Sequence, residues 1–262
     1  MAIRPTDSLE PWYAALEARQ MRDLKFQEVR RGLQALSSLY VERRSRLASG
    51  GALDGAGKRA AFALFYGPMH FAVTRDIVRA LRATRPAPKE IVDLGCGTGA
   101  AGAAFALESD PPPEITGIDR NSWAVDETSW TLRHFGLRGQ AARGDLDRQR
   151  LPGPRAAVLA AFTVNELEPS AQARLLTRLF EAAGRGASLL VIEPIARRAF
   201  PWWIGWAEAF KAAGGREDSW KFPAALPERW RLLDRAAGLD HRELVARSLW
   251  LAKEDHSKKQ RG

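Results

Sequence analysis

Apolar residues recur at steps of three and four positions along the first third of the chain. Five of them form the clearest run: Phe26, Val29, Leu33, Leu36 and Tyr40. This spacing puts apolar side chains on one side of an α-helix. We therefore expect two helical segments, at about residues 9–48 and 57–84, joined by a loop with the glycine-rich sequence ASGGALDGAG.

The pattern changes after the breaker sequence RPAPK, where short apolar runs begin to alternate with helical segments. That alternation is typical of a mostly parallel sheet in an α/β fold. The pattern predicts strands at residues 90–94, 114–118, 139–142, 156–162 and 188–192, with helices at 98–108, 122–135 and 170–183. It also predicts a last pair of strands, at 240–245 and 248–253.

The first predicted strand runs into a glycine-rich turn that opens the next helix. Asp93 stands two positions before Gly95, and Gly97 and Gly99 follow. Glycines allow a tight turn and let the backbone lie against a ligand. A phosphate-binding P-loop would end in Gly-Lys-Ser/Thr, and the dinucleotide fingerprint has no acidic residue before its first glycine. The turn therefore favours a different ligand.

The acidic-x-Gly-x-Gly-x-Gly pattern resembles the cofactor loop of class I methyltransferases that use S-adenosylmethionine (SAM). The resemblance covers about residues 89–253 and implies a Rossmann-like fold, with helices on both faces of a seven-stranded, mostly parallel sheet. In that family the loop backs the amino-acid part of SAM. A helical N-terminal region, at residues 1–86, is expected before a SAM-binding domain at 87–254 and a polar tail at 255–262.

Further cofactor contacts follow from the same resemblance. Asp119 ends the second predicted strand, where a carboxylate can accept hydrogen bonds from both ribose hydroxyls. The resemblance assigns Asp145 to the adenine amino group and the backbone amide of Leu146 to the adenine ring. It also implies that Arg120 and Phe162 lie beside the cofactor.

The segment after the fourth strand is where such enzymes present residues to the methyl acceptor, and it includes Asn165 and Glu166. Glu193, after the fifth strand, is a third candidate, either as a base or orienting group or as the partner of a local arginine. Exocyclic amine methylation is disfavoured because the Asn/Asp-Pro-Pro-Tyr/Phe pattern is absent. Carbon-5 methylation of a pyrimidine needs a cysteine nucleophile, and Cys96 lies in the glycine turn. An oxygen or nitrogen acceptor remains.

A narrower resemblance rests on three short motifs: VNEL after the fourth strand, IEP followed by an aromatic residue after the fifth, and YGPMHF in the helical region. Together they resemble the mitochondrial ribosomal small-subunit methyltransferase-like family and its bacterial relatives. Members associate with small-subunit assembly, and many carry cysteines for an iron–sulfur cluster. This chain has one cysteine, so no cysteine-based cluster or intrachain disulfide is expected. His70, within YGPMHF, is expected to be a packing or capping residue.

The net charge of +9 is concentrated near the N-terminus, since residues 1–88 hold 15 Lys and Arg against 8 Asp and Glu. A basic surface attracts polyanions such as RNA, although a solvated charged face gives the same pattern. Arg30, Arg31, Arg43 and Arg44 lie mostly off the apolar side of the first helix.

The sequence therefore predicts a SAM-dependent methyltransferase acting on an oxygen or nitrogen atom, with RNA, and ribosomal RNA above all, as the preferred acceptor. The alternatives are a small-molecule methyltransferase and a non-enzymatic ribosome-assembly factor that keeps the SAM fold. A nicotinamide enzyme is disfavoured by Asp93. No apolar run approaches the roughly 20 residues of a membrane span, so a soluble, cytoplasmic protein without a bound metal is expected.

Overall fold

The computed structural model describes residues 9–42, 53–195 and 201–252, and the side chains of 39–42 are outside this description. Seven strands form one sheet in the order β3-β2-β1-β4-β5-β7-β6. The strands are β1 (Glu90–Leu94), β2 (Glu114–Asp119), β3 (Gly139–Arg143), β4 (Ala156–Ala161), β5 (Ser188–Pro194), β6 (Arg216–Pro223) and β7 (Glu243–Leu251). Only β7 runs antiparallel to its neighbours β5 and β6.

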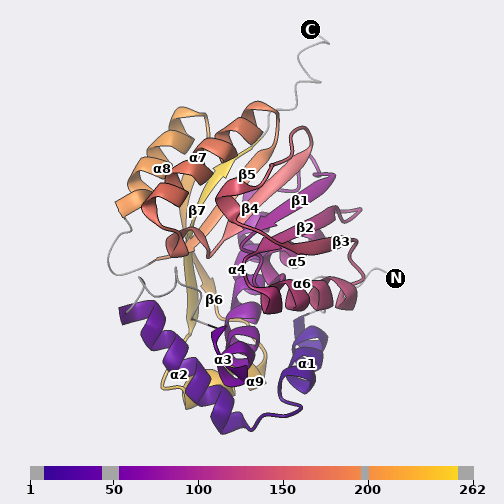
Figure 1. The fold of residues 1–262 in the computed structure, drawn as a ribbon, viewed down its shortest axis with the longest axis vertical. Helices are drawn as coiled ribbons and strands as arrows, with labels where there is room; N and C mark the ends of the chain where they lie inside the picture. Colours follow the sequence, from indigo (N-terminus) through magenta and orange to yellow (C-terminus); the bar gives the residue numbers. More distant parts are fainter. Residues whose placement is uncertain (1–8, 43–52, 196–200, 253–262) are drawn as a thin grey trace.

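Helices lie on both faces of this sheet, with α4, α5 and α6 on one and α7 and α8 on the other (Figure 1). The α-helices are α1 (Leu9–Gln20), α2 (Phe26–Glu42), α3 (Ala56–Ala61), α4 (Gly67–Leu81), α5 (Ala100–Leu107), α6 (Ser122–His134), α7 (Pro169–Gly184), α8 (Pro201–Ala212) and α9 (Glu228–Ala236). Short 3-10 turns are η5 (Leu146–Arg148) and η6 (Val164–Glu166), and a π-helical turn is η4 (Phe62–Tyr66).

Strand β4 shows why the sheet is buried on both sides. Its residues alternate between two hydrophobic clusters, with Ala157 and Leu159 in one and Val158 and Ala160 in the other. A strand covered on both faces has a continuous apolar sequence, as AAVLAA does. The predicted Rossmann-like architecture is confirmed, and the five parallel strands and three helices predicted for residues 90–192 match within two residues at each end.

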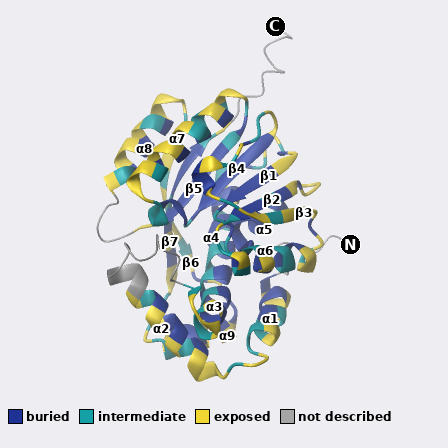
Figure 2. Cartoon of the chain, in the orientation of Figure 1, coloured by how far each residue is buried: buried dark blue, intermediate teal, exposed yellow. Residues whose placement is uncertain are grey.

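The N-terminal helices share a core with the sheet domain. Trp12 of α1 and Leu33 of α2 are fully buried in the same cluster as Trp230 of α9 and Trp250 of β7. Helices α1, α2, α3 and α9 gather below the sheet in Figure 1, and their inward sides are buried (Figure 2). The helical region therefore packs as one body with the elements that border the site.

The two long helices predicted for the N-terminal region are both interrupted. Residues 21–25 separate α1 from α2, and the side chain of Glu28 accepts a hydrogen bond from the backbone N–H of Lys25 (2.8 Å) at the start of α2. The predicted positions 43–48, with Arg43 and Arg44, lie outside the described residues. In the second segment, η4 inserts a π-helical turn between α3 and α4.

The predicted pair of strands at 240–253 is wrong. These residues contribute one strand, β7, and its neighbour β6 comes from residues 216–223. The expected turn falls in the middle of β7, where Ala246 is buried and Ser248 accepts a hydrogen bond from Trp220 Nε1 (2.8 Å) on β6. In the described part of the chain, no helix is both long and apolar enough to cross a membrane.

Candidate functional site

A cavity of about 350 Å³ opens at the carboxyl ends of β1, β2 and β4. The strand order reverses between β1 and β4, which is where open α/β sheets bind ligands. Its walls come from the glycine turn, the end of β2, the loop after β4, and the η4–α4 segment. The volume falls in the range of small-molecule and cofactor sites.

The glycine turn requires glycine for two separate reasons. Gly95, Gly97 and Gly99 have φ angles of +71°, +55° and +72°, which side-chain-bearing residues rarely adopt. A Cβ on Gly95 would also lie 2.1 Å from Thr163 Oγ1. Gly95 and Gly97 line the cavity, whereas Gly99 packs against Thr128 of α6 as α5 begins.

Asp93 lies beneath the turn and not among the cavity-lining residues. Its side chain is buried, and Oδ2 accepts a hydrogen bond from the backbone N–H of Gly102 (3.1 Å) in α5. Burial raises the pKa of Asp93 to about 7. Its visible contact therefore joins the turn to α5, and its contact with SAM stays a prediction.

Asp119 is placed as the sequence predicts, at the end of β2 and in the cavity wall. Its Oδ2 accepts a hydrogen bond from the N–H of Gly97 (3.1 Å), and its Oδ1 accepts one from the N–H of Asn121 (2.9 Å). These bonds fix the carboxyl group, although burial raises its pKa. A fixed carboxylate facing a cavity can accept hydrogen bonds from neighbouring hydroxyls. Arg120 is exposed at the same wall.

Asp145 and Leu146, predicted to contact adenine, are outside the cavity-lining set. Asp145 is exposed and lies 3.8 Å from Arg148 in an ion pair, while Leu146 is buried in the cluster on the α7 side of the sheet. Arg143, which sequence analysis did not single out, does line the cavity, and its Nε donates a hydrogen bond to the carbonyl of Arg120 (3.3 Å).

Of the predicted acceptor-facing residues, only Glu166 lines the cavity. Asn165 and Glu193 do not line it and instead form hydrogen bonds with each other; Glu193 is buried and Asn165 is half-buried. The side-chain amide of Asn165 donates to Glu193 Oε2, and the Asn165 backbone N–H donates to Oε1 (3.2 Å). Trp202 Nε1 donates to Asn165 Oδ1 (3.1 Å). Asn165 and Glu193 therefore position the turn that carries Glu166.

Glu193 is fully buried, and burial raises its pKa to about 8. The nearby Glu166 raises the pKa further, while the hydrogen bond from Asn165 and the charge of Arg247 lower it. Arg247 is the residue opposite Glu193 in the β5–β7 register, and its guanidinium lies 3.9 Å from the centre of the Trp203 ring. Glu193 is therefore near an arginine, as expected if it is the partner of a local arginine and not a base or orienting group.

Phe162 lines the cavity as predicted, and its backbone is strained. Its φ angle is +59°, an uncommon value for a residue with a side chain, and its N–H donates to the carbonyl of Ile192 (2.7 Å). Such strain is maintained by surrounding structure and clusters at ligand sites. The left-handed turn comes directly after β4, and Phe162, Thr163 and Glu166 of the following segment line the cavity.

His70 and Phe62 complete the wall; the sequence predicts only packing or capping for His70 and does not single out Phe62. His70 stacks on Phe162, with ring centroids 3.9 Å apart, and burial lowers its pKa to about 3. Phe62, in the π-helical turn, lies against the glycine turn, since a Cβ on Gly97 would be 3.4 Å from its ring. The expectation that His70 packs is correct, but its ring also faces the cavity.

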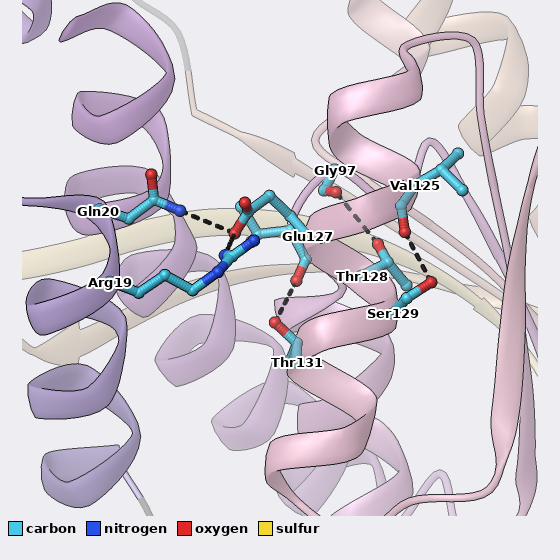
Figure 3. A network of polar contacts seen from close by, with 9 residues as sticks. Arg19, Gln20, Gly97, Val125, Glu127, Thr128, Ser129 and Thr131 are labelled. Atoms are coloured by element: carbon cyan, nitrogen blue, oxygen red, sulfur yellow. Dashed lines mark hydrogen bonds and ion pairs between the residues drawn. The ribbon is translucent and has the colours of Figure 1, made fainter. Parts of the chain in front are cut away.

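A polar network connects the N-terminal helices to the glycine turn (Figure 3). Arg19 and Gln20 of α1 both donate to Glu127 Oε2 on α6, at 2.5 and 2.9 Å. On the same helix, Thr128 Oγ1 donates to the carbonyl of Gly97 (3.1 Å), and Thr131 Oγ1 donates to that of Thr98 (2.7 Å). Helix α6 therefore supports the turn and α1 together.

Comparison with known proteins agrees with this architecture. Residues 73–184 match the family model described as methyltransferase small domain. A search of curated proteins finds no match.

Two solved structures show the same fold. The mitomycin 7-O-methyltransferase MmcR has a TM-score of 0.51 and 16% identity, over 95% of this chain and 73% of its own. A protein from Nostoc punctiforme PCC 73102 assigned as an O-methyltransferase has a TM-score of 0.50 and 15% identity, over 83% of this chain and 72% of its own. The family match over residues 73–184 and the shared fold are those of class I SAM-dependent methyltransferases.

Proposed function

We propose that this protein is a SAM-dependent methyltransferase that transfers a methyl group to an oxygen or nitrogen atom of RNA, with small-subunit ribosomal RNA as the preferred substrate. The observation that carries the proposal is the cationic rim of the cavity. Arg120 and Arg143 are exposed there, and neither forms an ion pair with another described residue. Together with a net charge of +9, they favour a polyanionic acceptor.

The residues that line the cavity are suited to binding SAM. Gly95 and Gly97 leave backbone exposed where a Cβ would occupy the space, which suits close approach of the amino-acid part of the cofactor. Asp119 is fixed for hydrogen bonds to the ribose. SAM supplies a methyl group on a positively charged sulfur, which is already activated for transfer. The protein then has to exclude water and orient the acceptor.

Glu166 and His70 are the titratable side chains at the end of the cavity formed by α4 and the loop after β4, where Thr163 adds a hydroxyl group. His70 is neutral at physiological pH because of its low pKa, so it can exchange hydrogen bonds with an acceptor without adding charge. Glu166 offers a carboxyl group in the same wall. We infer that Glu166 accepts the proton released by the acceptor and that His70 orients the acceptor.

A small-molecule acceptor is the second candidate, and the aromatic cover of the cavity favours it. Phe62 and Phe162 line the site from two sides. The structural match to mitomycin 7-O-methyltransferase also extends over 95% of this chain, including its helical region. An apolar, closed pocket is typical of enzymes that act on small molecules.

A transfer assay with radiolabelled methyl groups separates these candidates. Purified protein is incubated with labelled SAM and either small-subunit ribosomal RNA or an equal mass of transfer RNA, and a Glu166→Gln variant serves as the control. The proposal predicts label in ribosomal RNA, strongly reduced in the variant. Label in neither RNA contradicts it. SAM binding without RNA methylation favours a small-molecule acceptor, whereas RNA binding without SAM turnover favours an assembly factor.

A further inference from the structure

A second, smaller cavity of about 180 Å³ lies on the opposite side of the sheet from α4, α5 and α6. It is formed by the loop after η5 and the C-terminal half of α7. We call it the arginine cleft, and its lining residues are Gln149, Arg150, Leu151, Arg178, Glu181 and Arg185. Nothing in the methyl-transfer site described above uses these residues.

Two of the arginines are held in place by the loop they face. Arg178 Nη1 donates to the carbonyl of Gln149 (3.2 Å), and Arg185 Nη2 donates to the carbonyl of Leu151 (2.9 Å). Leu151 is itself buried, which anchors the loop. A guanidinium carries five N–H donors, so each arginine keeps further donors for a ligand. Immobilised guanidiniums lose less entropy on binding than free ones.

The charge in the cleft is positive. None of Arg150, Arg178 and Arg185 forms an ion pair with a described residue. Glu181 is the one acidic side chain in the lining, and the C-terminus of α7 adds roughly half a negative charge. The positive charge of the three guanidinium groups exceeds the combined negative charge of Glu181 and the helix C-terminus. The volume is below the roughly 300 Å³ of drug-sized ligand sites, so it suits a phosphate group better than a whole nucleotide.

The cleft is separate from the methyl-transfer site. It is lined by the C-terminal half of α7 and the loop before β4, whereas the cofactor cavity opens at the carboxyl ends of β1, β2 and β4. In the η5 segment, Arg174 on α7 pairs with Asp147 (2.7 Å) and Arg148 lies 3.8 Å from Asp145, so an aspartate offsets the charge of each arginine. The arginines of the cleft, which form no ion pair with a described residue, are therefore a cationic group distinct from the rim of the cofactor cavity.

We propose that the arginine cleft binds a backbone phosphate of the RNA substrate, at a distance from the nucleotide that is methylated. This inference rests on the proposed function, because it assumes an RNA acceptor. Arginine forms paired, directional hydrogen bonds with phosphate oxygens, which fix the position of a nucleic acid without reading its sequence. The cleft would thus orient RNA on the enzyme, while Glu166 and His70 act on the acceptor.

The test is the salt dependence of RNA binding, measured by fluorescence anisotropy with labelled small-subunit ribosomal RNA fragments. Arg150→Ala is the main variant, because Arg150 makes no hydrogen bond to another described residue. We expect it to weaken binding roughly three- to tenfold at low salt and to reduce the slope of log Kd against log salt by about one. Glu181→Gln should strengthen binding. Arg133→Ala, an exposed arginine on α6, is the matched control.

The outcomes separate the two proposals. If wild-type protein methylates the RNA but Arg150→Ala binds as wild type does, or loses no more than Arg133→Ala, the cleft inference is overturned and the proposed function stands. If wild-type protein neither binds nor methylates RNA, both fail. A selective loss in Arg150→Ala together with a gain in Glu181→Gln supports the cleft, and SAM binding should be unchanged in both variants.

Discussion

The imidazole of His70 lies flat on the phenyl ring of Phe162, with the ring planes 7° apart and the centroids separated by 3.9 Å. The two residues come from α4 and from the end of β4, and both face the cofactor cavity. The stack fixes the plane of the imidazole, so its ring nitrogens have defined directions. The strained backbone of Phe162 is part of this arrangement.

His70→Ala should leave the SAM dissociation constant within about twofold of wild type but lower methyl transfer by roughly tenfold, because a positioning contact to the acceptor is lost. His70→Asn should recover part of the rate, since an amide can also exchange hydrogen bonds. Calorimetry and transfer kinetics give the two quantities separately. His134→Ala, on the exposed end of α6, is the control. Equal rates in His70→Ala and His134→Ala would exclude a role for His70.

Asp119→Ala should weaken SAM binding at least tenfold, about 1.4 kcal/mol, through loss of the ribose hydrogen bonds. Asp126→Ala removes an exposed carboxyl from the neighbouring α6 and should leave affinity unchanged. Both are measured by calorimetric titration, with thermal unfolding to show that each variant folds. An Asp119→Ala variant that binds SAM like the control means that the ribose assignment is wrong.

Gly95→Ala separates the effect of backbone strain from that of steric overlap. Gly95 and Gly136 both have positive φ angles, +71° and +63°, but a Cβ would meet Thr163 only at Gly95. Gly136→Ala should cost about 1–2 kcal/mol of stability. Gly95→Ala should cost more and abolish SAM binding. Denaturant unfolding of both proteins gives the comparison, and equal losses would show that the Gly95 contact with Thr163 is unimportant.

Glu193→Gln tests the buried carboxyl group behind Glu166. The pKa of Glu193 is raised to about 8 by burial, so the folded protein binds its proton more tightly than the unfolded chain does. Its contribution to stability is fully present below about pH 4.5 and is lost as the pH rises through about 8. Wild type should therefore lose at least about 1.4 kcal/mol more than Glu193→Gln between pH 6 and 9.

Denaturant unfolding at several pH values measures that difference. Asp93, whose pKa is raised to about 7, titrates in the same range but is present in both proteins, so the comparison isolates Glu193. Parallel stability curves for wild type and variant would mean that Glu193 is ionised in the folded protein, with Arg247 and Asn165 compensating for its burial.

The parallel strands and the glycine turn could be predicted because local sequence determines them. A buried strand such as β4 has a continuous apolar run, and positive φ angles select glycine at Gly95, Gly97 and Gly99. Strand β6 was missed because it is an edge strand with a mostly polar sequence, REDSWKFP, and five of its eight residues are exposed. Its pairing with β7 depends on long-range contacts such as Trp220 with Ser248.

In the site too, local sequence predicts some residues, whereas others depend on long-range packing. Asp119 and Phe162 follow strand ends, so counting along the sequence places them. His70 and Arg143 join the cavity through packing between elements far apart in the chain, which single-sequence spacing does not encode. Glu193 was identified as a site candidate from its strand end, but the sequence does not show that Asn165 donates to its carboxyl group and that Trp202 in turn donates to Asn165.

Calorimetric titration of the purified protein with SAM, and separately with NADH, tests the cofactor assignment on which the whole account depends. We expect one SAM per chain, bound with a micromolar dissociation constant, and no measurable NADH binding. Adding small-subunit ribosomal RNA should leave SAM binding intact. Absence of SAM binding, or tighter binding of NADH, would contradict the account.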